Sequence, residues 1–169
     1  MKISTAALFS ALACAPAALL LPGAAAPAQA QYGAIIANSM RACSPGNGPA
    51  VRVTIRGIKS STGKIRLQSY HAREEDWLEK NRWINRIKVP ARKGSMTFCV
   101  PLPKPGAYAI AARHDANDNN ETDISADGGA MSNNPSINIF NLGRPGIEKT
   151  RFSVGREVKS MSITMLYFG

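Results

Sequence analysis

Short runs of alternating apolar and polar residues, separated by turn-forming residues, constrain this chain more than any other feature. Residues 51–56 and 64–70 both alternate, which places every second side chain on one face of a strand. Residues 60–63 between them read Ser-Ser-Thr-Gly, a sequence typical of a turn. The sequence therefore predicts a hairpin with one buried and one solvated face.

Further strand-like runs follow, with prolines at positions that suit strand ends or sheet edges. These runs are residues 86–89, 96–100, 106–113, 136–140, 150–154 and 158–167. About seven short strands with turn signals between them, and no strongly periodic helix, indicate a mainly β fold. We expect a single antiparallel β-sandwich.

Residues 71–85 lose the two-residue period and are expected to form a long excursion, with one or two helical turns over residues 73–80. The excursion contains Trp77, Trp83 and Ile84, which we expect to cover an open end of the sandwich. Stacking of these tryptophans on a ligand is the alternative.

The first thirty residues have the order of a signal peptide. Lys2 is their only charge, residues 6–21 are apolar except for Ser10, and Ala28 and Ala30 form an A-x-A cleavage site. We expect cleavage after Ala30 and a location in the periplasm or outside the cell. A retained membrane anchor would need a longer apolar run, and lipidation of Cys14 would need a better motif before it.

Cleavage of 30 of the 169 residues would leave 139, enough for one domain with a real core. We divide the chain into signal peptide 1–30, N-terminal segment 31–50 and β-sandwich domain 51–169. Cys43 and Cys99 remain after export, and an oxidising compartment favours a disulfide between them. Such a bridge contributes about 4 kcal/mol in the chain-entropy model.

The net charge of +10 becomes +9 without Lys2. This excess favours anionic partners, such as an anionic component of the cell envelope, although solvated basic faces are the simpler interpretation. Another envelope protein is also a candidate partner. Nucleic acid is disfavoured by export and by the lack of a binding motif, and residues 31–169 contain no apolar run of transmembrane length.

An Asp/Asn-rich segment carries the clearest chemical signal. Asp115, Asn117, Asn119 and Asp123 occupy positions 1, 3, 5 and 9 of an EF-hand-like loop, whose oxygens suit calcium. Asn120 replaces the usual glycine at position 6. Position 12 of the loop is Ala126 instead of a bidentate glutamate. The nearest carboxylate, Asp127, lies one residue later. The alternative is a metal-free scaffold of Asx turns.

Four further residues are expected to support this loop. His114 precedes it, and Ser132, Asn133 and Asn134 follow it and are expected to return to hydrogen-bond it. A role of His114 as metal ligand or acid–base group is the alternative.

Three motifs carry a resemblance to a known family: Pro103-x-x-Gly106-x-Tyr108-Ala109, His114-Asp115-x-Asn117-x-Asn119-x-x-x-Asp123, and Ser132-Asn133-Asn134. With them, residues 51–167 resemble the uncharacterised exported bacterial family known as domain of unknown function 2141. The resemblance implies a transthyretin-like (prealbumin-like) or carboxypeptidase-regulatory-like sandwich, and no established activity. The chain departs from the family at Asn120, where glycine is common, and at residues 129–131, where an aromatic residue usually precedes the Ser-Asn pair.

Signatures of catalysis are not readable in the sequence. It has no Gly-x-Ser-x-Gly elbow, no His-Glu-x-x-His and no phosphate-binding glycine loop. We therefore expect a non-catalytic binding module, stabilised by calcium if the Asp/Asn loop holds a cation. The alternative is a metal-free structural accessory domain of the envelope, and a hydrolase is the third possibility.

Overall fold

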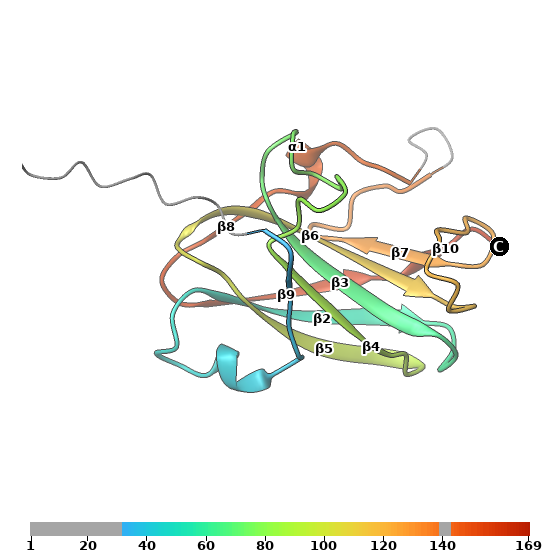
Figure 1. Ribbon diagram of the computed structural model, residues 1–169, viewed down its shortest axis with the longest axis horizontal. Helices are drawn as coiled ribbons and strands as arrows, with labels where there is room; N and C mark the ends of the chain where they lie inside the picture. The colour runs from blue at the N-terminus through green and yellow to red at the C-terminus, as the bar shows by residue number, and fades with distance from the viewer. Residues whose placement is uncertain (1–31, 139–142) are drawn as a thin grey trace, which may run out of the picture.

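The computed structural model describes residues 32–138 and 143–169 (Figure 1). It is mainly β, as predicted, with two sheets that face each other. The expected signal peptide and its cleavage site lie outside the described residues. The strands are β1 (Ala34–Ile35), β2 (Ala50–Ile58), β3 (Lys64–His71), β4 (Asn85–Pro90), β5 (Gly94–Pro101), β6 (Gly106–Asp115), β7 (Gly128–Met131), β8 (Phe152–Val154), β9 (Val158–Thr164) and β10 (Leu166–Tyr167). Two short helices are η1 (Met40–Cys43) and α1 (Ile147–Thr150).

The larger sheet has the strand order β1-β4-β3-β6-β7-β10, with β8 also paired to β6, and the smaller has the order β5-β2-β9. Most pairings are antiparallel, but β2 with β9 and β1 with β4 are parallel. The expectation of an antiparallel β-sandwich of about seven strands is therefore confirmed in part: the fold is mainly β with two sheets, but it has more strands than expected and these two pairings are parallel. β9 follows β2 only after the chain has passed through the larger sheet, and such a long connection permits a parallel neighbour.

The predicted hairpin is also wrong, because β2 and β3 belong to different sheets. The register of β2 shifts between Arg56 and Ile58, at Gly57, whose φ is +76°. This bulge precedes the segment that carries the chain across to the larger sheet. Alternation fixes one buried face for each strand, and two facing sheets satisfy that requirement as well as a hairpin does.

The main core lies between the two sheets. Its fully buried side chains include Val53 and Ile55 of β2, Leu67 of β3, Phe98 of β5 and Ile110 of β6. Each occupies an alternate position of its strand, so the opposite positions of β3 and β6 form the outer face of the larger sheet.

A second apolar cluster covers part of this outer face. It consists of Tyr70, Trp77, Trp83, Ala109, Met131, Ile137 and Ile147. The excursion, predicted over residues 71–85 and observed over residues 72–84, supplies both tryptophans, and in Figure 1 it lies with α1 on the side of the larger sheet away from β2 and β5. The tryptophans therefore cover a sheet face and do not close an end of the sandwich. A flat face offers them apolar partners along three strands.

The excursion is anchored by one buried carboxylate. Asp76 is 0% exposed and accepts hydrogen bonds from the Tyr32 hydroxyl at 2.8 Å and from Nε of Arg82 at 2.8 Å. The indole nitrogen of Trp77 donates to the carbonyl of Pro145 at 2.8 Å. The excursion contains turns but no strand or helix, and these side-chain contacts hold it together with backbone hydrogen bonds such as that from the N–H of Trp77 to the carbonyl of Arg73.

The C-terminal strand predictions hold in part. Residues 150–154 divide between α1 and β8, and residues 158–167 form β9 and β10 with a break at Met165. Residues 136–138 are not a strand, and the rest of that predicted run lies outside the described residues. Strand β7 was not expected at all.

The disulfide is confirmed. Cys43 and Cys99 are joined by an S–S bond of 2.02 Å across a sequence separation of 56 residues. Both are buried next to Ala50, so the bridge ties η1 to β5 and β2. No helix in the described part of the chain has the length and apolar character needed to span a bilayer.

Candidate functional site

Strand β6 delivers the Asp/Asn loop to one end of the larger sheet. Tyr108, Ile110, Ala112 and His114 point into the core, and Ala109, Ala111 and Arg113 lie on the outer face. The strand ends at Asp115, and the chain returns as β7, which pairs with residues 111–114 of β6. The loop, residues 115–127, is therefore closed at its base by two neighbouring strands.

Three of the four predicted ligands meet within the loop. Oδ2 of Asp123 accepts hydrogen bonds from the side-chain amides of Asn117 at 2.8 Å and Asn119 at 2.7 Å. These two bonds, followed by the charge of Arg113, hold the pKa of Asp123 below its usual value. The amide oxygens accept from backbone N–H groups two residues on, at Asn119 and Glu121, which are Asx turns.

The fourth predicted ligand, Asp115, is held separately. Its side chain is 1% exposed, and Oδ2 accepts from the Arg113 guanidinium and from the backbone N–H of Asn120, each at 3.1 Å. Oδ1 is buried and has no hydrogen-bond partner among the described residues. Within the same residues, no group of three or more His, Cys, Asp or Glu side chains is placed to hold a metal ion.

Asp127, which the sequence pattern marked only as a misplaced carboxylate, closes the loop. Oδ1 accepts from the backbone N–H of Ala116 at 3.1 Å, and Oδ2 accepts from that of Asp123 at 3.2 Å. Oδ2 also lies 3.8 Å from Nε of Arg113. A buried carboxylate directly before a returning strand is a signal that loop spacing alone did not reveal.

The loop is fastened to the outer face of the sheet by lysines. Nζ of Lys64 pairs with Asp118 at 2.5 Å, and Lys88 donates to the Asn120 side chain and lies 4.0 Å from Asp118. The hydrogen bond from Lys64 lowers the pKa of Asp118. Asp118 and Asn120 both have positive φ, a conformation that Asn and Asp tolerate better than other residues with a Cβ.

His114 lies on the core side of β6, away from the loop oxygens. Its ring is fully buried, with Nε2 2.8 Å from the carbonyl of Thr62 and Nδ1 2.7 Å from the hydroxyl of Tyr167. A carbonyl can only accept, so Nε2 carries the proton and Nδ1 accepts from Tyr167. Both ring nitrogens are therefore engaged with the turn before β3 and with β10.

Ser132, Asn133 and Asn134 follow β7 at its end away from the loop. Ser132 donates to the carbonyl of Thr150, and Asn133 to that of Arg151. The side chain of Asn134 bonds the backbone of β9 at Ser162 and Thr164. Their hydrogen bonds join the end of β7 to the end of α1, to Ile110 of β6 and to β9, and not to the Asp/Asn loop.

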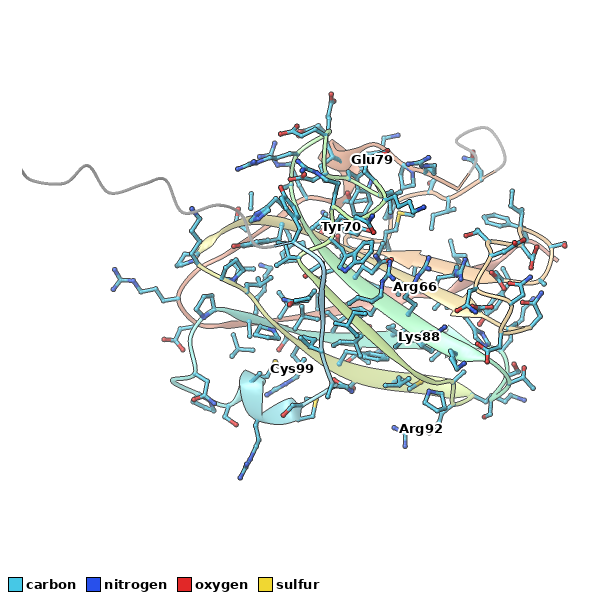
Figure 2. The ribbon with its side chains drawn as sticks, in the orientation of Figure 1. Arg66, Tyr70, Glu79, Lys88, Arg92 and Cys99 are labelled. Carbon is cyan, nitrogen blue, oxygen red and sulfur yellow. A yellow bond between two sulfur atoms is a disulfide. The ribbon has the colours of Figure 1, made fainter. Side chains whose placement is uncertain are left out.

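A pocket of about 560 Å³ lies on the outer face of the larger sheet. Its floor consists of side chains from β3, β4, β6 and β7, and its walls come from the excursion, the Asp/Asn loop, Ile137, Gly143, Arg144 and Phe168. Figure 2 shows Arg66 and Tyr70 rising from the same side of β3 beneath the segment that carries Glu79. Strand periodicity alone did not predict this pocket, although a row of cationic residues at outward-facing strand positions marks its floor.

These features define a mainly β protein of two facing sheets, with an Asp/Asn loop at one end of its central strand and a basic pocket beside it. The chain belongs to the family described as an uncharacterized protein conserved in bacteria (DUF2141), whose model matches residues 53–162. The match runs from β2 to β9 and includes the loop and the pocket floor, and it confirms the resemblance. No curated protein and no solved structure was found to match the chain.

Proposed function

We propose that this chain is an exported, non-catalytic binding module built on a transthyretin-like sandwich. The pocket on the outer face of the larger sheet carries the proposal. Its size is typical of small-molecule sites, and its lining combines apolar side chains with charged and other polar ones. Loops supported by a sheet are the usual location for binding residues.

The lining chemistry suits the binding of a charged ligand. The described lining residues present arginines, one tyrosine and carboxylates, of which Glu79 and Asp127 lie near Arg144 and Arg113. A hydrolytic site needs a nucleophile within hydrogen-bond reach of a base, whereas these two carboxylates are engaged with arginines.

Filling the pocket tests the binding module. Ala111 lies on the pocket floor, so Ala111→Trp should abolish saturable binding of the neutral probe N-phenyl-1-naphthylamine, measured by equilibrium dialysis. Ser160→Trp, at an exposed position of β9 in the other sheet, is the matched control and should bind as the unsubstituted protein does. Absence of saturable binding in the unsubstituted protein overturns the proposal.

Calcium binding by the Asp/Asn loop is a second candidate, favoured by the buried, unpartnered Oδ1 of Asp115. A cation beside Oδ1 would supply the missing partner, and rotation of the Asn117 and Asn119 amides would turn their oxygens toward Asp123 and the ion. Titration calorimetry with calcium should then give heat with the unsubstituted protein and none with Asp115→Ala. Asp118→Asn, in the same loop but outside the ligand set, should retain the heat.

A metal-free accessory domain is the alternative, and it predicts no heat and no thermal shift with calcium in any of these proteins.

Export has its own test. The protein recovered from the periplasm or medium of an expressing bacterium should begin at Gln31, as determined by N-terminal sequencing. Recovery of the intact N-terminus in the cytoplasm would contradict it.

A further inference from the structure

We propose that the pocket binds a small amphipathic organic anion, with its oxyanion group at Arg66 and Arg86 and its apolar body against Trp83, Met131 and Ile137. This inference rests on the proposed binding module and names the class of its ligand. It follows from an excess of positive charge at the pocket floor that the described part of the protein does not neutralise.

The strand register creates that excess. On the outer face, Arg66 of β3 lies directly opposite Arg113 of β6 on one side and Lys88 of β4 on the other. Arg86 of β4 is one outward position away, opposite Gln68. Like charges at directly opposed positions destabilise a sheet, so four cations on three adjacent strands need a compensating partner.

Two of the four cations have such partners. Arg113 contacts Asp115 at 3.1 Å and Asp127 at 3.8 Å, and Lys88 contacts Asp118 and Asn120. Arg66 and Arg86 have no ion pair in the described residues, and Nε of each is buried without an acceptor. Glu79, a carboxylate in the pocket wall, is already paired with Arg144 at 3.2 Å.

The electrostatic environment of the two free arginines agrees with this geometry. Burial, followed by the charge of neighbouring arginines, lowers the pKa of Arg66, and burial lowers that of Arg86. An arginine stays protonated even so, because its ordinary pKa lies above 12. Their charges are therefore retained in partly desolvated surroundings, where an anion gains most from charge-assisted hydrogen bonds.

The pocket also positions these groups before any ligand arrives. The guanidinium carbon of Arg86 lies 3.5 Å from the centre of the Trp83 ring, a cation–π contact. Burial raises the pKa of Tyr70, beside them, to about 12, so its phenol is neutral at physiological pH. Arg86 is thus held against an aromatic wall that can also contact the ligand.

The remaining lining residues specify the body of the ligand. Trp83, Met131 and Ile137 belong to one apolar cluster, against which Leu78 packs, and all four line the pocket. Asp123 and Asp127 line the end of the pocket near Arg113 and would repel a second negative group there. One oxyanion at Arg66 and Arg86, joined to an apolar body, matches this distribution.

Two fluorescent probes separate the charge from the apolar body. 8-Anilinonaphthalene-1-sulfonate carries a sulfonate on the scaffold that N-phenyl-1-naphthylamine has without charge. Equilibrium dialysis should give a Kd at least about tenfold lower for the sulfonate, since one charge-assisted hydrogen bond contributes about 1.5 kcal/mol or more. Arg66→Gln and Arg86→Gln should each remove about tenfold of sulfonate affinity and leave the neutral probe unchanged.

Arg56→Gln is the matched control, because it removes the same charge from an exposed position of β2 in the other sheet. It should leave both affinities unchanged. Equal loss of sulfonate binding in Arg56→Gln shows a general charge effect and overturns the inference. Equal binding of both probes to the unsubstituted protein also overturns it, while pocket binding itself stands. Saturable binding of neither probe removes the binding module.

The ligand-free variants supply an independent measurement. Because the substitution removes an uncompensated charge and leaves the contact of Arg86 with Trp83 in place, Arg66→Gln should raise the midpoint of thermal unfolding, and Arg56→Gln should change it less. A lower midpoint in Arg66→Gln would show that this arginine stabilises the ligand-free fold, which contradicts the inference.

Discussion

The hydroxyl of Tyr167 lies 2.7 Å from Nδ1 of His114, although 53 residues separate them in the sequence. The same hydroxyl accepts a hydrogen bond from the backbone N–H of Lys59 at 3.1 Å, and Nε2 of His114 bonds Thr62. One buried ring therefore connects the end of β6, the turn before β3 and β10.

Loss of the Tyr167 hydroxyl should destabilise the protein. Tyr167→Phe leaves Nδ1 of His114 as a buried acceptor without a donor, at a cost of about 1–3 kcal/mol. Urea unfolding of Tyr167→Phe, His114→Gln and the double variant measures the coupling free energy between the two residues. Simple additivity of the two losses would contradict the hydrogen bond.

Removal of the disulfide should also lower the free energy of unfolding. The bridge closes a loop across a separation of 56 residues, which corresponds to about 4 kcal/mol in the chain-entropy model. The paired substitution Cys43→Ala with Cys99→Ala should show this loss in denaturant unfolding, and reduction of the unsubstituted protein should match it. A change below about 1 kcal/mol would mean that the native contacts around η1 suffice.

Acidification should destabilise the protein through His71. Its ring is half-buried between Tyr32 and Tyr108, and Nε2 is buried with no hydrogen-bond partner among residues 32–138 and 143–169. Burial, then the charge of Arg73, lowers its pKa from 6.5; Lys104 and Arg82 add to this, and Asp76 opposes it. The unfolded chain therefore binds this proton more readily, so the stabilising contribution is present above pH 6.5 and is lost as the pH falls through the lower folded pKa.

Unfolding free energies measured at several values between about pH 7.5 and about pH 5, the range in which histidine titrates, test this expectation. The unsubstituted protein should lose more stability over this interval than His71→Gln. The two proteins differ only at position 71, so the difference between their profiles reports on His71. Parallel pH profiles would assign the loss of stability to other groups.

A glycine in the turn before β3 should prove essential to the base of the Asp/Asn loop. Gly63 has φ +68°, and a Cβ there would lie 1.9 Å from the carbonyl oxygen of Asp115. Gly63→Ala must therefore displace the backbone, and should cost more than the roughly 1 kcal/mol of an unfavourable φ alone. Gly94→Ala is the control, because Gly94 has φ +97° with no atom within 4 Å of the added Cβ. Equal losses of unfolding free energy would show that the loop base adapts.

Local pattern predicted the strands whose side chains alternate. Residues 51–56, 64–70 and 106–113 were expected as strands and lie within β2, β3 and β6. The excursion and the disulfide were predicted for equally local reasons, a lost period and an even number of cysteines in an exported chain. β7 was missed because its sequence, Gly-Gly-Ala-Met, has no alternation, and it pairs with β6 through backbone bonds.

The spacing of Asn117, Asn119 and Asp123 predicted that these side chains lie close together, because all three belong to one short loop. It could not assign His114 to the core, because that position depends on Tyr167 of β10 and on the turn before β3. It could not assign Asp127 to the loop base either, because that depends on the return of the chain as β7. Ser132, Asn133 and Asn134 illustrate the same limit, because the direction of β7 carries them away from the loop.

The sequence by itself determined that the chain forms β-strands with one apolar face each, that two cysteines pair, and that one loop is rich in carboxylates and amides. Periodicity and composition are local properties, and they decide which face of a strand is buried. Only the tertiary structure decided which strands are neighbours, and hence that Arg66 faces Arg113 and Lys88 while the excursion and the Asp/Asn loop enclose the space above them. Register between distant strands depends on the packing of the whole core, so no local pattern contains it.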